Sequence, residues 1–366
     1  MKKKIIIISV VLVLLAVCAA VGYYAYRVFM AANINANPES PTYKYLYVRA
    51  DDTWDDVIEQ LDTNGWISSI DDLKMCIKYL EKEVPQCGKY DLEPNLPNRV
   101  FVNRLAYGLS NKGKLQLKLT RYTPVVAKKL SDQLAIDSAS LADVFLADTL
   151  LQKYGLDQES SLALFVRFDT TIQWCASAKE VEACVLDARH RFWNEERLEK
   201  AKKLGLSLKD IHILASIVEE ESNDYEDRRK IAGVYLNRLR IKMPLQADPT
   251  ARFAVGDFTL NRILKKHIQI KSPYNTYVCP GLPPGPIRIP TNNSIDAVLN
   301  YVSHNYIYFC AKADFSGTHN FAVTYTEHLR NARAYQKAIT IWIREKKARE
   351  KAEAEAKAKA EAEKVR

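Results

Sequence analysis

The sequence lacks the residue spacings that hold metal ions in most small metal sites. None of its seven cysteines belongs to a Cys-x-x-Cys pair, and its six histidines are scattered along the chain. Clustered Cys and His ligands are the usual sign of a zinc site. We therefore expect neither a metal site nor a cofactor.

The sequence also lacks a concentrated basic patch in its interior. The 366 residues carry a formal net charge of +9, but the lysines gather at the two ends and the interior mixes both signs. We therefore expect no nucleic-acid partner, since such proteins present a basic face. A basic balance suits anionic lipid or an anionic polymer such as cell wall. The composition, 48% hydrophobic and 27% charged, is that of a globular chain long enough for two domains or more.

A long apolar run stands at the N-terminus, from Ile5 to Gly22, after three lysines and before several tyrosines. Such a run can cross a hydrocarbon core of about 30 Å as a helix. Lysines before it and aromatics after it favour a cytoplasmic start. We expect residues 1–30 to be an uncleaved anchor of a single-pass inner-membrane protein whose remainder is periplasmic. One alternative is a cleaved signal peptide, although the sequence lacks a clear small-x-small cleavage site. The other is a lipoprotein modified at Cys18, although the residue before it, Val17, is bulky where a small residue is normally needed.

Six cysteines follow the anchor, and their state is open. Outside the cytoplasm they could form disulfides, in any of fifteen pairings, or they could be buried free thiols. The six are Cys76, Cys87, Cys175, Cys184, Cys279 and Cys310.

Residues 42–122, which follow a polar linker at 31–41, predict a β-α-α-β unit and then a helix and a strand. Two Ser/Thr-x-x-Asp capping boxes mark the starts of the first two helices. The expected elements are strands at 45–49, 88–94 and 115–122 and helices beginning after Thr53, after Ser69 and near 96.

The stretch Val-x-x-x-Asp-Thr-Trp at 48–54 resembles the LysM module, which binds the N-acetylglucosamine of peptidoglycan or chitin. Ala50 and Asp51 stand where that module usually has glycine near the turn. The resemblance implies sugar binding by a LysM-like subdomain, and the alternative is a β-α-α-β unit that only packs.

The rest of the chain predicts an α+β protein that is mostly helical, with short strands near its end. We expect a helical connecting region at 123–206, a catalytic domain at 207–343, and a charged helical tail at 344–366 without an apolar stripe.

Three adjacent glutamates end an apolar helical run in SIVEEESN, residues 216–223. On a helical wheel Glu221 lies about 20° from the buried-face residue Leu214, whereas Glu219 and Glu220 lie about 140° and 120° away. The wheel therefore predicts that Glu221 points inward and that its two neighbours point toward solvent. Burial raises the pKa of a carboxyl group, so Glu221 could donate a proton near neutral pH. The alternative is a structural glutamate that caps a helix or pairs with an arginine.

Several polar, Pro- and Gly-containing stretches follow, as expected of loops that shape a carbohydrate cleft. Together with Glu-x-Glu-Ser at 219–222, their order and spacing within 207–340 resemble the YceG-like (MltG-type) endolytic murein transglycosylases. The loop stretches are LQADPT (245–250), SPYNTY (272–277) and GLPPGPI (281–287), and the resemblance also includes the motifs NRL (237–239) and HNF (319–321). The segment LFVRFDTT at 164–171 departs from that family, where an aromatic- and Pro-rich segment is expected.

The resemblance implies cleavage of the MurNAc-GlcNAc β-1,4 bond of nascent glycan strands, with formation of 1,6-anhydro-MurNAc ends. It assigns the acid/base role to Glu221 and suggests glycan contacts at Gln246, Asn275, Tyr277 and His319, each of which could instead stabilise a loop. It also implies peptidoglycan synthases as partners. The alternatives are a hydrolytic muramidase, with Asp248 as the second carboxylate, and a non-catalytic peptidoglycan-binding scaffold.

Overall fold

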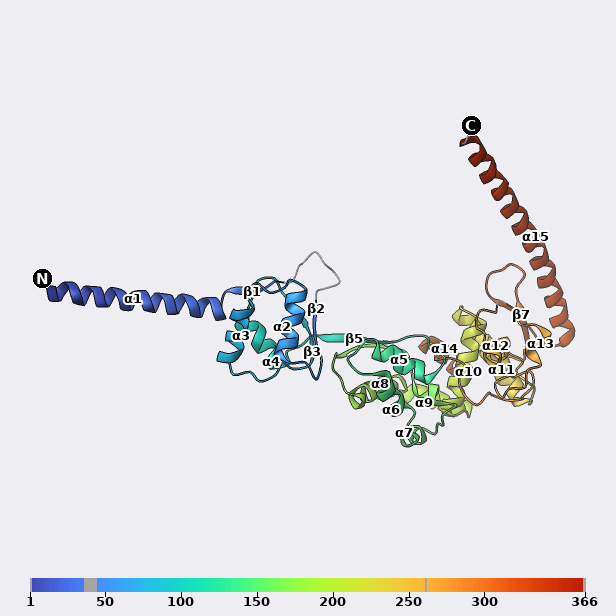
Figure 1. The fold of residues 1–366 in the computed structure, drawn as a ribbon. Coiled ribbons are helices and arrows are strands. Elements are labelled where there is room, and N and C mark those ends of the chain that lie inside the picture. The colour runs from blue at the N-terminus through green and yellow to red at the C-terminus, as the bar shows by residue number, and fades with distance from the viewer. Residues whose placement is uncertain (1, 36–44, 261, 365–366) are drawn as a thin grey trace. The chain divides into compact units, whose positions relative to one another are not determined.

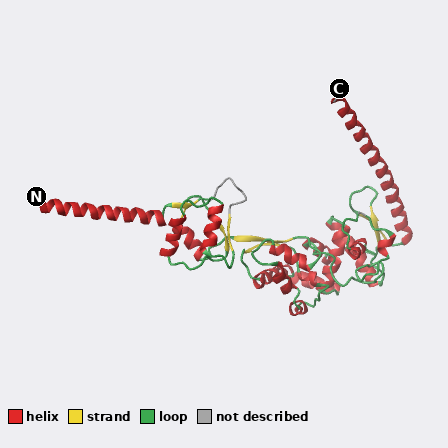
Figure 2. Ribbon diagram, in the orientation of Figure 1, coloured by secondary structure: helices red, strands yellow, loops and turns green. Residues whose placement is uncertain are grey.

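The structure is a computed structural model that describes residues 2–35, 45–260 and 262–364. Helices dominate and the strands are short (Figures 1 and 2), as the sequence predicts. The chain forms two compact units. Unit 1 consists of residues 1–116, 127–141 and 169–181, and unit 2 of residues 117–126, 142–168 and 182–366.

The helices are, in chain order, α1 (Lys2–Phe29), α2 (Trp54–Thr63), α3 (Ile70–Tyr79), α4 (Asn98–Ala106), α5 (Thr123–Ser131), α6 (Ser138–Phe145), α7 (Asp148–Lys153), α8 (Ala178–Phe192), α9 (Glu195–Leu204), α10 (Leu208–Glu221), α11 (Tyr225–Arg240), α12 (Asp248–Val255), α13 (Lys265–Ile268), α14 (Asn292–Leu299) and α15 (Tyr325–Lys364), with a 3₁₀ turn, η1, at Ser161–Leu164. The strands are β1 (Ala32–Ile34), β2 (Tyr45–Val48), β3 (Gly88–Asp91), β4 (Leu96–Pro97), β5 (Lys112–Leu117), β6 (Phe168–Gln173), β7 (Tyr308–Ala311) and β8 (His319–Ala322). They pair as β1–β4, β2–β3, β5–β6 and β7–β8.

The first helix, α1, is apolar and exposed over most of its length. Its 28 residues extend about 42 Å at 1.5 Å per residue, more than a hydrocarbon core requires. By length and composition it can cross a membrane. The predicted apolar helix is therefore confirmed.

The predicted β-α-α-β order is present in unit 1. Strands β2 and β3 pair antiparallel, and the helices α2 and α3 lie between them in the chain. The Thr53 hydroxyl caps α2 by accepting from the Asp56 amide, and Ser69 caps α3 by accepting from Asp72. Residues 32–34, at the start of the predicted linker, form β1, and residues 36–44 lie outside the described residues. The predicted strand at 115–122 is confirmed only to Leu117.

One cysteine pairing is present. Cys87, just before β3, is bonded to Cys175, just after β6, and both belong to unit 1. The remaining cysteines have free thiols, and one of them, Cys18, is on α1. Both open alternatives for the cysteines are thus realised in one chain.

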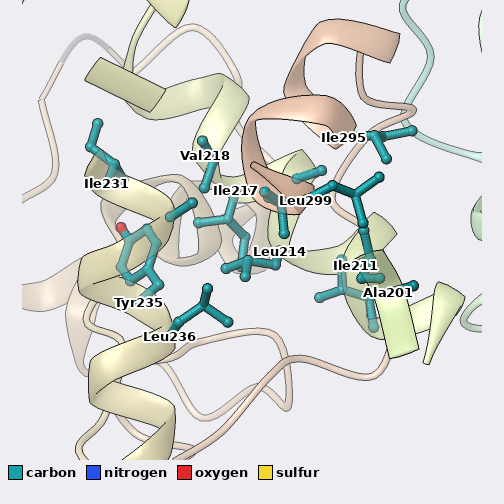
Figure 3. Close-up of a cluster of buried hydrophobic side chains, with 14 of the residues drawn as sticks. Ala201, Ile211, Leu214, Ile217, Val218, Ile231, Tyr235, Leu236, Ile295 and Leu299 are labelled. Carbon is teal, nitrogen blue, oxygen red and sulfur yellow. The ribbon is translucent and has the colours of Figure 1, made fainter. Parts of the chain in front are cut away.

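The core of unit 2 is formed where α10, α11 and α14 pack together (Figure 3). Leu214 and Ile217 of α10 are fully buried there, as the wheel predicts, and Tyr235 of α11 is buried beside them. The hairpin β7–β8 and the start of α15 follow α14, which agrees with the short strands expected near the end of the chain. This packing determines where the end of α10 lies.

Candidate active site

The end of α10 places the three glutamates. A capping box between Ser207 and Asp210 starts the helix, and Ser222, in an extended conformation, ends it. The Arg228 side chain holds this end from α11, since its Nε donates to the Ser222 carbonyl oxygen at 2.6 Å. The carboxylates are therefore fixed at the junction of two packed helices.

Glu221 lies in the wall of a cavity and is partly exposed. Burial raises the pKa of its carboxyl to about 7, against the opposing effect of the Tyr235 hydroxyl, which donates to Glu221 Oε1 at 2.7 Å. The nearby negative charge of Asp248 raises the pKa further. The C-terminal end of a helix also disfavours an anion. Glu221 is thus a carboxyl that can carry a proton near neutral pH.

Glu219 and Glu220 do not point to solvent, and the prediction of the wheel is wrong for both. Their side chains are 5% and 10% exposed. A wheel describes one helix, whereas here segments distant in the chain enclose the helix end on the side that the wheel leaves open. The enclosing residues are arginines, which neutralise both carboxylates.

Glu219 lies in the more buried part of this network. Its carboxylate pairs with Arg167 at 2.8 Å and with Arg288 at 2.9 Å, and it accepts from the Thr291 amide and, at 2.9 Å, from the Ser294 hydroxyl. Burial alone would raise the pKa of Glu219, but these partners together lower it. Glu219 therefore stays ionised.

Glu220 belongs to the same network of ion pairs as Glu219. It pairs with Arg121 at 2.8 Å and also with Arg288. Arg288 thus contacts both carboxylates. Arg167 belongs to the segment LFVRFDTT, so this departure from the family pattern supplies part of the support for α10.

The cavity beside Glu221 has a volume of about 330 Å³. Four of the five predicted site residues line it, namely Glu221, Gln246, Tyr277 and His319. Glu221 is the last residue of α10 and His319 the first residue of β8. Gln246 lies in the loop before α12, and Tyr277 lies in the loop after α13. The fold thus brings together residues spread over about a hundred positions of the sequence.

Tyr277 and Gln246 belong to facing loops. The Tyr277 hydroxyl donates to Asp248 Oδ1 at 2.6 Å, and the Gln246 amide donates to the Thr276 carbonyl oxygen at 3.1 Å. Gln246 has φ of +51°, a conformation that is uncommon outside glycine and leaves its side chain exposed at the cavity. Asp248 also lines the cavity.

Asn275 is placed differently from the other predicted residues. It is fully buried, and its amide nitrogen donates to the carbonyl oxygens of Ile268 and Ile270, at 3.0 and 2.8 Å. Its side-chain oxygen accepts from the Tyr277 amide at 3.1 Å. Asn275 thus organises the loop that carries Tyr277 and does not itself line the cavity.

His319 is held by a buried carboxylate. Its Nδ1 lies 2.6 Å from Asp227 Oδ2, and its backbone amide donates to Asp227 Oδ1 at 3.1 Å. Burial would raise the pKa of Asp227, but the hydrogen bonds and charge of His319 lower it. This contact fixes the imidazole ring on β8.

Sequence reasoning missed three kinds of residue at this site. Tyr235 touches Glu221, Asp227 orients His319, and an aromatic group beyond α11 completes the cavity wall: Tyr308, Tyr325 and His328. A tyrosine on the buried face of a helix needs a partner for its hydroxyl, and this was the available signal for Tyr235. Within the described ranges, no group of three or more His, Cys, Asp or Glu side chains could hold a metal ion.

The fold resembles a solved structure. The crystal structure of a YceG-like protein from Listeria monocytogenes superposes with a TM-score of 0.51 at 23% sequence identity, covering 78% of this chain and 98% of that one. The two proteins therefore share a fold.

The sequence match is more specific. Residues 46–334 match the YceG-like family, and the chain belongs to it. Curated relatives include the endolytic murein transglycosylase of Bacillus subtilis (strain 168), 44% identical over 127 residues, which are 35% of this chain and 34% of that protein. The enzyme of the same name from Streptococcus pneumoniae (strain D39) is 35% identical over 134 residues, 36% of this chain and 24% of that protein. The matched region thus spans about a third or less of each relative.

Proposed function

We propose that this protein is a membrane-anchored endolytic lytic transglycosylase of peptidoglycan. The observation that carries the proposal is Glu221, a carboxyl with a pKa of about 7 at a polar cavity in a chain of the YceG-like family. The names of the curated relatives support the same activity. The substrate is the nascent glycan strand, cut at the MurNAc-GlcNAc β-1,4 bond.

Glu221 serves first as acid and then as base. Its proton passes to the glycosidic oxygen as the bond to the muramyl C1 breaks. The resulting carboxylate then accepts the proton of the muramyl C6 hydroxyl, whose oxygen attacks C1 and closes the 1,6-anhydro ring. Each half of the reaction restores the protonation state that the other requires, so a pKa near 7 suits both.

The other cavity residues take supporting roles in the proposal. Gln246, Tyr277 and His319 bind the sugar hydroxyl and N-acetyl groups, and Asn275 holds the loop of Tyr277 in place. Asp248, the candidate second carboxylate of a hydrolase, accepts a hydrogen bond from Tyr277. This engagement favours transglycosylation over a muramidase that activates water.

The remaining parts fit a protein that works outside the cytoplasm. We assign α1 as a single-pass anchor in the inner membrane, and the Cys87–Cys175 disulfide is consistent with an oxidising compartment for unit 1. The β-α-α-β unit would hold N-acetylglucosamine as a LysM-like subdomain, within the proposed domain limits 42–122, 123–206 and 207–343. Peptidoglycan synthases are the proposed partners.

Digestion of purified glycan strands with the full chain in detergent, followed by mass spectrometry of the products, tests the activity. We expect 1,6-anhydro-muramyl ends. Reducing muramyl ends would instead show a hydrolase. Intact strands under varied pH and salt would favour a peptidoglycan-binding scaffold.

A further inference from the structure

Unit 2 contains a second cavity, of about 340 Å³, with an aromatic lining. The Phe253 ring lies 5.7 Å from the ring of Tyr122 and 4.7 Å from that of Tyr274, measured between centroids. Tyr122 is 44% exposed, so its ring is accessible. Gln158 and the exposed Glu159 add polar groups at the cavity. Nothing in the proposed catalytic step uses this cavity.

Three chain segments connect the aromatic cavity with the catalytic one. Helix α12 contributes Asp248 to the catalytic cavity and Phe253, about 7.5 Å further along its axis, to the aromatic one. The loop after α13 contributes Tyr277 to the first and Tyr274 to the second. The two sites are therefore built on a shared support.

The third connection is Arg121, which lines the aromatic cavity. Its Nη2 pairs with Glu220, the neighbour of Glu221, and its guanidinium lies 4.3 Å from the centroid of the Phe258 ring. Arg121 thus links the lining of the aromatic cavity to the C-terminal end of α10.

We propose that the aromatic cavity binds an N-acetylhexosamine ring of the same glycan strand, remote from the bond that is cut. This inference rests on the proposed function. A cavity of about 330 Å³ is at the small end of ligand sites, so a polymer cut within its length continues over the protein surface. Binding energy from remote parts of a substrate can be used to position the reacting part.

The chemistry of the cavity fits a neutral sugar ring. Aromatic faces pack against the apolar face of a sugar. The Gln158 amide nitrogen already donates to Leu146 and Asp148, so the Gln158 side-chain oxygen and the Glu159 carboxylate are left to accept hydrogen bonds from the hydroxyl and N-acetyl N–H groups of the sugar. Arg121 of the same lining is paired with Glu220, so the exposed Glu159 carboxylate is the charge that a ligand would meet, and it disfavours the carboxylates of a stem peptide. The occupant is therefore the glycan backbone and not the peptide.

The test uses the full chain in detergent with Glu221→Gln, which prevents turnover, and peptide-free glycan oligomers prepared with an amidase. Adding Tyr122→Ala should weaken binding of long oligomers roughly five- to tenfold and leave binding of the shortest oligomers unchanged. Tyr122→Phe should restore binding, because it keeps the ring. Tyr225→Ala is the matched control, an aromatic residue of unit 2 that is 37% exposed and lines neither cavity.

Hydrogen exchange of the same complexes locates the contact and separates it from binding by the β-α-α-β unit. Long oligomers should slow exchange around Tyr122 and residues 253–274. Equal affinity of the Tyr122→Ala and Tyr225→Ala proteins for long oligomers, without that protection, would overturn the inference even if the wild type forms anhydro ends. An effect of Tyr122→Ala seen only with stem peptides attached would also overturn it. Failure of the wild type to form anhydro ends, with Tyr122-dependent binding retained, would overturn the catalytic proposal alone.

Discussion

The surroundings of the two sides of the α10 end shift the pKa of a glutamate carboxyl in opposite directions. On one side, Glu219 is surrounded by Arg167, Arg288 and hydrogen-bond donors, and its pKa is lowered although it is buried. On the other side, Glu221 is partly exposed at the cavity and has a tyrosine hydroxyl as its direct partner, and loss of solvation raises its pKa to about 7. Loss of solvation acts to raise the pKa of both carboxyls, so the presence or absence of paired arginines decides the protonation state. Glu219 is therefore an ionised, arginine-paired carboxylate, whereas Glu221, two residues further along α10, can carry a proton.

The largest expected effect comes from removing the proton donor. Glu221→Gln should lower the rate of glycan cleavage at least about a hundredfold, because an amide cannot exchange the proton that both half-reactions need. Product formation followed by mass spectrometry measures it. Full activity in Glu221→Gln, with loss in folded Glu219→Gln, would reverse the assignment.

Removing the charge of Glu219 should instead lower the stability of the fold of unit 2. Glu219→Gln leaves Arg167 without its buried counterion and Arg288 with Glu220 alone, and it should lower the free energy of unfolding of unit 2 by about 3 kcal/mol. Denaturant unfolding measures it. Glu226→Gln, which breaks the exposed pair with Arg229, is the control and should cost less than about 1 kcal/mol. Equal losses in the two variants would contradict the comparison.

The raised pKa of Glu221 also predicts a pH-dependent cost in stability. The unfolded chain releases this proton near pH 4.5 and the folded chain near pH 7, so stability falls as pH rises across that window. Glu221→Gln removes this cost and should be more stable than wild type at pH 8 by about 2 to 3 kcal/mol, a gain that shrinks toward pH 4.5. Unfolding curves at pH 8 and pH 5 measure it. The same difference at both values would mean that Glu221 is not protonated near neutral pH.

The smallest effect concerns the tyrosine partner. The Tyr235 hydroxyl favours the ionised form of Glu221, so Tyr235→Phe should raise the pKa of Glu221. Because the protonated form starts the reaction, the alkaline limb of the pH–rate profile should move upward by up to about one pH unit. A profile that moves downward would show that the hydroxyl does not stabilise the carboxylate.

Local sequence signals predicted much of the frame around the site. Ser/Thr-x-x-Asp patterns marked the starts of α2 and α3, and the wheel identified Leu214 as part of the buried surface of α10. The motifs also predicted Gln246, Tyr277 and His319, which line the same cavity as Glu221. These signals depend on residues only a few positions apart, so they can be recognised in a single sequence.

The missed features depend on contacts that are distant in the sequence. The helical wheel predicts solvated charges at Glu219 and Glu220 because their arginine partners lie about 50 to 100 residues away, at 121, 167 and 288. The Cys87–Cys175 pairing was one of many that the sequence allowed. Asn275, chosen for its amide, uses that amide to hold its own loop.

The disulfide also has a consequence for the order of biogenesis. The two cysteines are 88 positions apart, so this disulfide cannot form until the segment that ends in Cys175 has been synthesised. Residue 175 lies about half-way along the 366-residue chain. Unit 1 can therefore be cross-linked only after about half of the chain exists, and the timing of oxidation becomes part of how the protein matures.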